Sequence, residues 1–452
     1  MNPHIFREYD IRGVVGRDLT DESVYDLARA IGTFFSRNGV RRVSLGRDAR
    51  ESSPLFRDLL ARGFNQSGLD VVDVGMVPTP VLYYTLFTQG VDAGVMITGS
   101  HNPPNENGFK ICLGKSTIFG GQISEIKEIA FARDFAAGTG RVEERDILEE
   151  YRGYIASHIS LGPRRLKVVV DGGNGMGGMV GAPLYHAMGC DVVELFCEPD
   201  SRFPNHHPDP TVVENMRFAI KAVAEHAADL AIAFDGDGDR IGVVDERGRV
   251  IWGDQQMIIF SRAILQAQPG AKFIAEVKCS QVLFDDIRAH GGEALMWKVG
   301  HSLIKSKMKE IGAQMAGEMS GHLFFADRYF GYDDAVYAGA RLLEILSHTD
   351  QPLSQLLADV PATVFTPEIR LDCPDEKKFA VVRALTEEFK RTHDVVDIDG
   401  ARIRFAHGWA LVRGSNTQPV VVMRFEADTQ EHLDEMRRLL ESKAQRLIDA
   451  GE

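Results

Sequence analysis

Residues 231–244 read AIAFDGDGDRIGVV, in which two short apolar runs flank a loop of alternating acidic residues and glycines. Short runs rich in Val and Ile that are bounded by Gly, Asp or Pro are typical of β-strands. The stretch is therefore expected to form strands at 231–234 and 241–244, joined by the acidic loop.

The same kind of apolar run recurs along the chain. The further predicted strands are 43–45, 71–74, 94–97, 167–170, 273–277 and 420–425. Longer amphipathic stretches lie between several of them, and these predict helices at 22–36, 54–67, 213–226 and 254–265. Alternating strands and helices favour an α/β fold built in layers.

The strand–helix pattern restarts in three blocks on the scale of about 100 residues or more, the usual size of one domain. The last block differs, because it reads as a strand, a helix at 376–392, two or three strands and a closing helix at 430–450. We therefore expect three α/β domains and a smaller C-terminal α+β domain. The expected limits are 1–146, 147–248, 249–360 and 361–452.

The composition is that of a soluble globular protein, with 44% hydrophobic and 26% charged residues in a chain of 452. The 51 Lys and Arg against 65 Asp and Glu give a net charge of −14. Phosphate backbones and anionic lipids attract an excess of Lys and Arg, so no nucleic-acid or membrane partner is expected. A locally basic cleft on such a chain still suits a small anion.

The five cysteines are scattered and form no C-x-x-C pair, so neither a disulfide framework nor a zinc site is indicated. The N-terminal segment is charged and lacks the apolar core of a signal peptide. No run of about 20 uncharged apolar residues predicts a membrane span. A reducing, cytoplasmic setting is expected.

The acidic loop at 235–240 places Asp235, Asp237 and Asp239 at alternate positions. Carboxylates spaced by glycine can converge on one hard cation, and without a cation they would repel one another. An EF-hand is disfavoured, because Arg240 replaces the required glycine and the flanks read as strands. The alternative is a solvated acidic turn. Arg240 beside the acids could face an anion held on the metal.

The heptad TGSHNPP at 98–104 follows the predicted strand 94–97. Its glycine frees the backbone, and its two prolines prevent continuation into a helix. Ser100 is thus expected on a tight exposed turn beside the imidazole of His101, as a hydroxyl nucleophile or a phosphate acceptor. The alternative is an ordinary polar turn. No G-x-S-x-G elbow occurs, which disfavours an α/β-hydrolase.

Two further loops carry ligand-binding side chains. In GEMSGH (317–322), Glu318, Ser320 and His322 combine an acceptor, a hydroxyl and an imidazole, which suits a polyhydroxylated ligand, although the segment also reads as a plain loop. In RGSNTQP (413–419), an arginine, two hydroxyls, an amide and backbone N–H groups could cradle a phosphate. The cradle residues are Arg413, Ser415, Asn416 and Thr417.

The glycine-rich segment 171–178 contains a formal G-x-G-x-x-G, with Glu194 near the distance expected of a ribose ligand. This spacing supports a nicotinamide-dependent oxidoreductase as a hypothesis from another enzyme class. The competing interpretation is a strand-to-helix turn that serves packing.

Taken together, the four loops indicate metal-assisted phosphoryl transfer to or from Ser100 with a phosphorylated polyol as ligand. They fall in four successive blocks, as expected for a cleft shared by four domains.

The chain resembles the α-D-phosphohexomutase superfamily, most closely its bacterial phosphomannomutase/phosphoglucomutase branch. The resemblance covers essentially the whole chain and rests on many motifs in the family's order. They are FREYDIRG (6–13), GRDAR (46–50), TGSHNPP (98–104), NGFK (107–110), HHPDP (206–210), DGDGDR (235–240), EVKCS (276–280), VGHSLIK (299–305), GEMSGH (317–322) and RGSNTQP (413–419).

The resemblance implies three related mixed-sheet α/β domains and a smaller α+β domain around a central cleft. It implies a phosphoserine at Ser100 and Mg²⁺ held by Asp235, Asp237, Asp239 and a phosphoserine oxygen. Phosphate would move between the 1- and 6-positions of a hexose phosphate through a hexose 1,6-bisphosphate, which is both intermediate and activator.

The resemblance also implies roles for the other matching residues. Lys110 and His322 are the expected general acid/base groups, and Arg12 and His101 complete the expected catalytic set. The expected substrate-binding residues are Tyr9, Arg240, Lys278, His301, Glu318, Ser320, Arg413, Ser415, Asn416 and Thr417.

The methionine in GEMSGH favours the mannose/glucose branch, whereas RGSNTQP departs slightly from the family's usual loop and leaves sugar preference open. Phosphoglucosamine or phosphopentose mutases remain alternatives, and a non-catalytic sugar-phosphate sensor is disfavoured because the serine and the acids are all present. A monomer or weak homodimer is expected.

Overall fold

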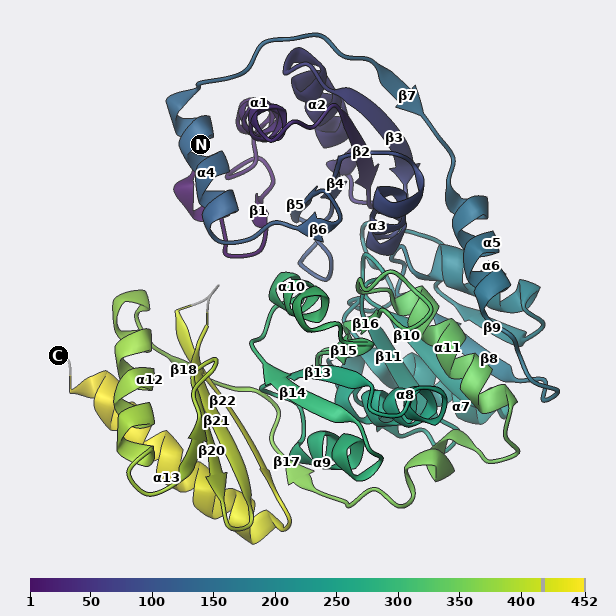
Figure 1. The fold of residues 1–452 in the computed structure, drawn as a ribbon, viewed down its shortest axis with the longest axis vertical. Helices are drawn as coiled ribbons and strands as arrows, with labels where there is room; N and C mark the ends of the chain where they lie inside the picture. Colours follow the sequence, from purple (N-terminus) through teal and green to yellow (C-terminus); the bar gives the residue numbers. More distant parts are fainter. Residues whose placement is uncertain (416–418, 451–452) are drawn as a thin grey trace.

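The computed structural model describes residues 1–415 and 419–450. Four β-sheets follow one another along the chain, and each has its own helices (Figure 1). The fold therefore consists of three mixed-sheet α/β units and a smaller C-terminal α+β unit, as the sequence predicted.

The first sheet has the strand order β1-β5-β4-β2-β3-β7, with β6 beside β5. Its strands are β1 (Ile11–Val14), β2 (Arg42–Arg47), β3 (Asp70–Met76), β4 (Ala93–Ile97), β5 (Glu106–Leu113), β6 (Ser116–Thr117) and β7 (Val142–Glu144). Its helices are η1 (Pro3–Ile5), α1 (Asp21–Arg37), α2 (Ser53–Gln66), α3 (Thr79–Thr88) and α4 (Gly121–Ala132).

Helices cover both faces of this sheet. Because neighbouring residues of a strand point to opposite faces, each strand contributes side chains to two cores. Val71 packs in the core that contains α1, α2 and α4, whereas Val72 packs in the core that contains α3. Val95 and Met96 divide in the same way. Burial on both faces explains why these strands read as continuous apolar runs.

The second sheet has the order β12-β11-β10-β8-β9, and the third has the order β14-β13-β15-β16. The second comprises β8 (Lys167–Asp171), β9 (Asp191–Leu195), β10 (Leu230–Phe234), β11 (Ile241–Asp245) and β12 (Val250–Ile251), with α5 (Leu148–His158), α6 (Gly178–Ala187), η2 (Val213–Met216) and α7 (Arg217–His226). The third comprises β13 (Lys272–Glu276), β14 (Glu293–Trp297), β15 (Met315–Gly317) and β16 (Leu323–Phe325), with α8 (Gly253–Ala267), α9 (Gln281–Ala289), α10 (His301–Ile311), α11 (Ala335–Ser347) and η3 (Leu353–Leu357).

The fourth sheet is antiparallel, in the order β17-β22-β21-β20-β19 with β18 also beside β22. It comprises β17 (Val364–Phe365), β18 (Ile369–Asp372), β19 (Asp394–Val396), β20 (Ala401–Phe405), β21 (Gly408–Gly414) and β22 (Val420–Ala427), with α12 (Asp375–Phe389) and α13 (Gln430–Asp449) packed on one face. One hydrophobic core runs through the first three units, whereas the fourth unit has a core of its own.

Two details differ from the sequence prediction. The expected helix at 213–226 begins as the 3₁₀-helix η2 before continuing as α7. The last block has two strands before its first helix, where one was expected, and four after it. The leading segment is divided at Pro367, which has no N–H to donate to β22.

The five cysteines are buried and free. In the described residues, no helix is both long enough and apolar enough to cross a membrane.

Candidate functional site

Ser100 occupies a strained turn directly after β4. Its φ is 48°, in the left-handed region that few non-glycine residues adopt. Its N–H donates to Thr98 Oγ1 at 2.8 Å, which satisfies the backbone within the turn. Ser100 is largely buried at 9% exposure, where an exposed turn was expected.

Arg50 holds this turn in place through hydrogen bonds to its backbone. The guanidinium is 1% exposed and donates to the carbonyl oxygens of Ser100 (2.8 Å), Asn102 (2.6 Å), Pro103 (2.6 Å) and Glu106 (2.8 Å). A Cβ at position 99 would lie 2.5 Å from the guanidinium carbon, so only glycine leaves room for it. The glycine before Ser100 is thus explained by a close approach of side chain to backbone.

The serine turn is in contact with the acidic loop of the second unit. Ser100 Oγ donates to Asp235 Oδ2 at 2.8 Å and lies 3.0 Å from His101 Nδ1. A Cβ at position 236 would lie 2.2 Å from the Ser100 carbonyl oxygen, so the two backbones are packed closely together. The hydroxyl therefore lies at the edge of the carboxylate cluster.

The acidic loop joins β10 to β11 as an antiparallel pair, which confirms that it is not an EF-hand. Asp235 Oδ1 fixes the turn by accepting from the N–H groups of Asp239 and Arg240, each at 3.1 Å. Asp237 Oδ2 accepts from Thr79 Oγ1 at 2.5 Å, at the start of α3.

The three carboxylates fit a hard divalent cation. All are fully buried, and their ligand oxygens lie within 4.8 Å of one another. Asp237 Oδ1 and Asp239 Oδ1 are buried and have no hydrogen-bond partner among the described residues. Buried carboxylate oxygens normally have a partner, and oxygen-only ligand sets suit Mg²⁺.

Lys110 supplies positive charge to this cluster. Its ammonium, on β5, donates to Asp237 Oδ2 at 2.6 Å and also to Asp239 Oδ2. Burial opposes the charged ammonium, but these carboxylates outweigh burial and raise the pKa of Lys110.

The carboxylates respond differently to this environment. Burial and the neighbouring carboxylates raise the pKa of Asp235, and the same causes raise the pKa of Asp239. Burial also opposes ionisation of Asp237, but Lys110 and the hydrogen bonds to that carboxylate lower its pKa. Burial, Arg240 and Arg12 lower the pKa of His101, so this imidazole is neutral near pH 7.

His322 is flanked by charged groups on both sides of its ring. Arg240 Nε donates to Nε2 at 2.9 Å, which leaves Nδ1 as the nitrogen that can donate. Nδ1 lies 3.1 Å from Asp333 Oδ2 and 3.6 Å from Asp239 Oδ1. Asp333 in turn accepts from Lys305 at 2.9 Å. His301 stacks on His322 with ring centroids 5.8 Å apart, and burial lowers the pKa of His301.

The loop at 317–322 belongs to the same centre. Glu318 Oε1 accepts from Gly300 N at 2.7 Å, and Glu318 Oε2 accepts from Ser320 Oγ at 3.1 Å. Tyr9 donates to Val299 O at 3.2 Å, which ties the N-terminal segment to this loop region of the third unit.

Lys278 lies between two carboxylates. Its ammonium is 3.7 Å from Glu276 Oε1 and donates to Glu368 Oε1 at 3.0 Å. The Lys278 charge lowers the pKa of Glu368 to about 2, whereas burial raises the pKa of Glu276 to about 6. Glu276 also accepts from the backbone N–H of Met319 at 3.2 Å, so it links Lys278 to the 317–322 loop.

The fourth unit approaches through Arg413. Arg413 pairs with Asp399 at 3.2 Å, and Asp399 accepts from Val299 N at 3.1 Å. Ser415 is buried, and its N–H donates to Val420 O at 3.0 Å. Asn416 and Thr417 lie outside the described residues.

Arg12 completes the group. Its guanidinium pairs with Asp10 and approaches Asn102 Oδ1 at 3.5 Å, next to the serine turn. Burial opposes the charge, but the carboxylate of Asp10 raises the pKa of Arg12.

The structure thus brings most of the predicted site residues together: Ser100, His101, Lys110, Arg12, Arg240, His301, His322 and the three aspartates. It places Lys278, Glu318, Ser320 and Tyr9 on adjoining loops.

The glycine-rich segment 171–178 packs against protein instead of presenting an open turn. A Cβ on Gly175 would lie 2.7 Å from Gly236 O, and a Cβ on Gly177 would lie 2.5 Å from Phe234 Cβ. Met176 N donates to Gly236 O at 2.9 Å. The segment supports the acidic loop, so its glycines are explained by packing and not by a dinucleotide.

Sequence reasoning missed Arg50, Glu276, Asp333 and Asp399. The signal for Arg50 was present, because GRDAR follows a parallel strand at the sheet edge where Ser100 also lies. Asp333 had only a weak signal, as the first of two acidic residues directly after the aromatic stretch 329–332. Their importance depends on contacts between distant segments.

Comparisons with known proteins agree with this geometry. Sequence profiles of phosphoglucomutase/phosphomannomutase alpha/beta/alpha domains I, II and III match residues 3–137, 149–248 and 252–364, and the profile of the C-terminal domain matches 368–441. A phosphomannomutase/phosphoglucomutase of Pseudomonas putida is 46% identical over 98% of this chain and 96% of its own. A phosphoglucomutase of Neisseria meningitidis is 46% identical over 96% of this chain and 95% of its own.

A solved structure shares the fold. The crystal structure of a phosphoglucomutase/phosphomannomutase family protein from Burkholderia thailandensis superposes with a TM-score of 0.93 at 43% identity, covering 99% of this chain and 98% of that one. Four domain profiles in order and close relatives of nearly full length leave one assignment: the chain belongs to the phosphoglucomutase/phosphomannomutase family.

Proposed function

We propose that the chain interconverts the 1- and 6-phosphates of mannose and glucose, with Ser100 as the phosphate carrier and Mg²⁺ held by Asp235, Asp237 and Asp239. The observation that carries the proposal is the 2.8 Å hydrogen bond from Ser100 Oγ to Asp235 Oδ2, beside carboxylate oxygens that accept no hydrogen bond from any described residue. A bound Mg²⁺ would neutralise negative charge on the transferring phosphoryl group.

The proposed transfer exchanges one O–P bond for another. The bond between Ser100 Oγ and phosphorus breaks as the sugar hydroxyl oxygen bonds to phosphorus, and the sugar proton passes to a protein base. The resulting 1,6-bisphosphate reorients and returns its other phosphate to Ser100. We assign the proton transfers to Lys110 and His322, because both side chains lie against the carboxylate cluster.

We assign the remaining contacts to substrate recognition. Arg12 would supply positive charge beside the phosphate on Ser100. The neutral imidazole of His101 would contact the same group. Residues proposed to bind the sugar and the distal phosphate are Tyr9, Arg240, Lys278, His301, Glu318, Ser320, Arg413, Ser415, Asn416 and Thr417. The four proposed domains, 1–146, 147–248, 249–360 and 361–452, each contribute one binding loop.

The test is an assay of 6-phosphate formation from a panel of sugar 1-phosphates. Glucose 1-phosphate and mannose 1-phosphate, with Mg²⁺ and a trace of hexose 1,6-bisphosphate, should each yield a 6-phosphate. Glucosamine 1-phosphate and ribose 1-phosphate should be poorer substrates. No 6-phosphate from either hexose with folded protein would overturn the proposal.

The serine assignment is tested separately by intact mass. Ser100→Ala should lose both the added phosphate and turnover, whereas Ser124→Ala, an exposed serine on α4, should retain both. An active Ser100→Ala protein would refute the assignment of Ser100 as the phosphate carrier.

The proposed oligomeric state, monomer or weak homodimer, is tested by light scattering over a concentration series.

A further inference from the structure

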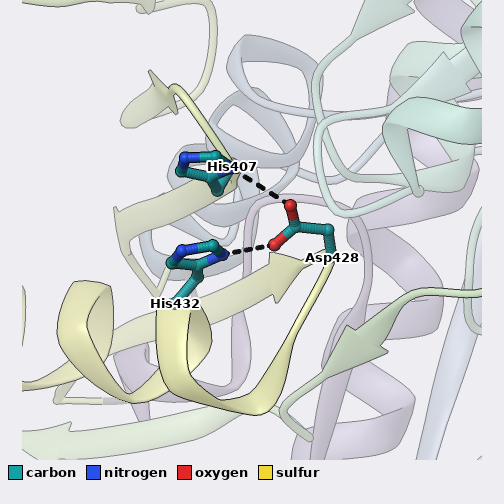
Figure 2. Close-up of side chains that lie close together, drawn as sticks. All are labelled: His407, Asp428 and His432. Carbon is teal, nitrogen blue, oxygen red and sulfur yellow. Dashed lines mark hydrogen bonds and ion pairs between the residues drawn. The ribbon is translucent and has the colours of Figure 1, made fainter.

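Three side chains gather on the surface of the fourth unit, away from the residues described above (Figure 2). His407 Nδ1 lies 3.1 Å from Asp428 Oδ2, and His432 Nδ1 lies 2.6 Å from Asp428 Oδ1. The imidazoles stack with ring centroids 3.9 Å apart and planes 12° apart. Two imidazole nitrogens therefore face one carboxylate.

The backbone holds these side chains in place. His407 lies in the turn between β20 and β21, Asp428 directly follows β22, and His432 lies in the first turn of α13. Asp428 N donates to His407 O at 3.1 Å. Thr429 caps α13 by accepting from His432 N at 3.3 Å. The arrangement is thus built by three segments that are fixed relative to one another.

The donor atoms suit a different ion from that of the central carboxylates. One nitrogen from each imidazole and one carboxylate oxygen lie within 4.8 Å of one another. Imidazole and carboxylate ligands suit Zn²⁺, Co²⁺ and Cu²⁺, whereas Mg²⁺ prefers oxygen alone. We propose that His407, Asp428 and His432 form a second cation site that binds a first-row divalent transition ion, such as Zn²⁺ or Cu²⁺.

Binding would replace the two hydrogen bonds to Asp428 and the 3.0 Å contact between His432 Nδ1 and Thr429 Oγ1. Each neutral ring would carry its proton on Nε2 and offer the lone pair of Nδ1 to the ion. The side chains of His407 and Asp428 are 55% and 54% exposed, so they can separate slightly without disturbing the core. The remaining coordination positions face solvent and can be filled by water.

An ion here would act on the fourth unit. It would join the turn at His407 to the start of α13. Two of its ligands, His407 and Asp428, line a hollow of about 460 Å³ whose lining also includes Asp285 and Arg288 of α9. Binding only to the folded state would stabilise that state in proportion to ion concentration.

The experiment is a titration of the untagged full-length protein with Zn²⁺, followed by calorimetry and by thermal unfolding. Excess Mg²⁺ is kept present, because the central carboxylates also attract divalent ions. The wild-type protein should bind one more equivalent of Zn²⁺ than the His407→Gln/His432→Gln variant, with a rise in Tm that the variant lacks. Each single variant should weaken binding about tenfold or more, since it removes one of three ligands.

The matched control is His290→Gln. His290 lies 3.4 Å from Asp286 with the same i, i+4 spacing as His432 and Asp428, but none of the described residues adds a second imidazole to that pair. This variant should bind Zn²⁺ like the wild type. A second readout, the electron paramagnetic resonance of bound Cu²⁺, should show coupling to two nitrogens that is lost in the double variant.

Two outcomes would overturn the site. One is equal stoichiometry and affinity for Zn²⁺ in the wild-type and double-variant proteins. The other is an equal loss of binding in His290→Gln, which would show that surface histidines bind the ion without any built site.

Discussion

Ser100 Oγ donates a 2.8 Å hydrogen bond to Asp235 Oδ2, although the two residues are 135 positions apart and belong to different sheets. The backbone reinforces this side-chain contact, because Gly236 lies against the Ser100 carbonyl oxygen. The proposed nucleophile and the proposed cation site are therefore joined by packing as well as by a hydrogen bond.

Gly236→Ala should separate the serine turn from the acidic loop. The new Cβ would lie 2.2 Å from a backbone oxygen, which cannot rotate away as a side chain could. We expect a loss of about 1–3 kcal/mol in the free energy of unfolding, as for overpacking, and at least a tenfold loss of kcat. The measurements are urea denaturation and mutase assay.

The control for that change is Gly153→Ala on α5. A Cβ there meets nothing within 4 Å, and alanine favours a helix by about 1 kcal/mol over glycine. This variant should gain stability and keep full activity. Equal losses in the two variants would contradict the role given to Gly236.

Arg50→Lys should disorganise the serine turn while keeping a positive charge. A lysine cannot reach the four carbonyl oxygens that the guanidinium holds, and each lost hydrogen bond to a charged group costs about 1.5–3 kcal/mol. We expect slow phosphate incorporation at Ser100, measured by intact mass, with little change in KM.

The comparison for Arg50 is Arg37→Lys, at an exposed pair with Asp134. Exposed ion pairs contribute about 1 kcal/mol or less, so this variant should be close to wild type. Normal rates of phosphate incorporation in folded Arg50→Lys would show that Arg50 does not position the serine.

Lys110→Met should make stability depend on Mg²⁺. Without the ammonium, Asp237 and Asp239 lose their ionic partner, and breaking a buried pair costs about 3–5 kcal/mol. We expect a lower Tm in chelator, partial recovery with Mg²⁺, and tighter Mg²⁺ binding than in the wild-type protein. The variant should lack turnover with or without Mg²⁺, because Lys110 is also a proposed proton-transfer group.

Lys305→Met provides the matched case, because Lys305 is equally buried and pairs with Asp333 at 2.9 Å. Its Tm should also fall, but Mg²⁺ should restore little of the loss. Equal recovery by Mg²⁺ in both variants would contradict the view that Lys110 substitutes for the cation.

Glu368→Gln should change how stability depends on pH. Lys278 lowers the pKa of Glu368 to about 2 from an ordinary value of 4.5. A depressed carboxyl pKa stabilises the fold above the unfolded value, and this stabilisation is lost as pH falls from about 4.5 towards 2. The variant should thus be less stable than wild type at pH 7, by about 3 kcal/mol at most.

The difference between the two proteins should narrow as pH falls below about 4.5, when measured by urea denaturation at each pH. Arg370 also approaches Glu368, so Arg370→Gln serves as the control and should have a smaller effect. A difference in stability that stays constant with pH would show that ionisation of Glu368 is not responsible.

Much of the site could be predicted from single short segments of the sequence. The glycine and proline spacing of TGSHNPP placed Ser100 on a tight turn, and the apolar flanks of DGDGDR placed its acids between two strands. Both predictions are confirmed at the level of local structure, with Ser100 at a positive φ and β10 paired with β11. The four-unit α/β fold and the family were also correctly predicted.

Other parts of the site could not be predicted from any one segment. Lys110 reaches the acidic loop because β5 inserts between β1 and β4, with Met96 opposite Lys110 in the register. The hydrogen bonds from Arg50 to the serine turn join residues at least 50 positions apart in the chain. The contact of Asp333 with His322 joins the ends of two different loops.

The sequence by itself determined the strands, the loops and the chemical groups that they carry, because backbone conformation near glycine and proline and the burial of apolar runs are local properties. Only the tertiary structure decided that Ser100 bonds to Asp235, that Lys110 neutralises two aspartates, and that His407 and His432 meet at Asp428. The first two relationships arise from packing between units, which joins residues far apart in the chain. The third arises from the pairing of β21 with β22, which brings His407 beside Asp428 at the start of the last helix.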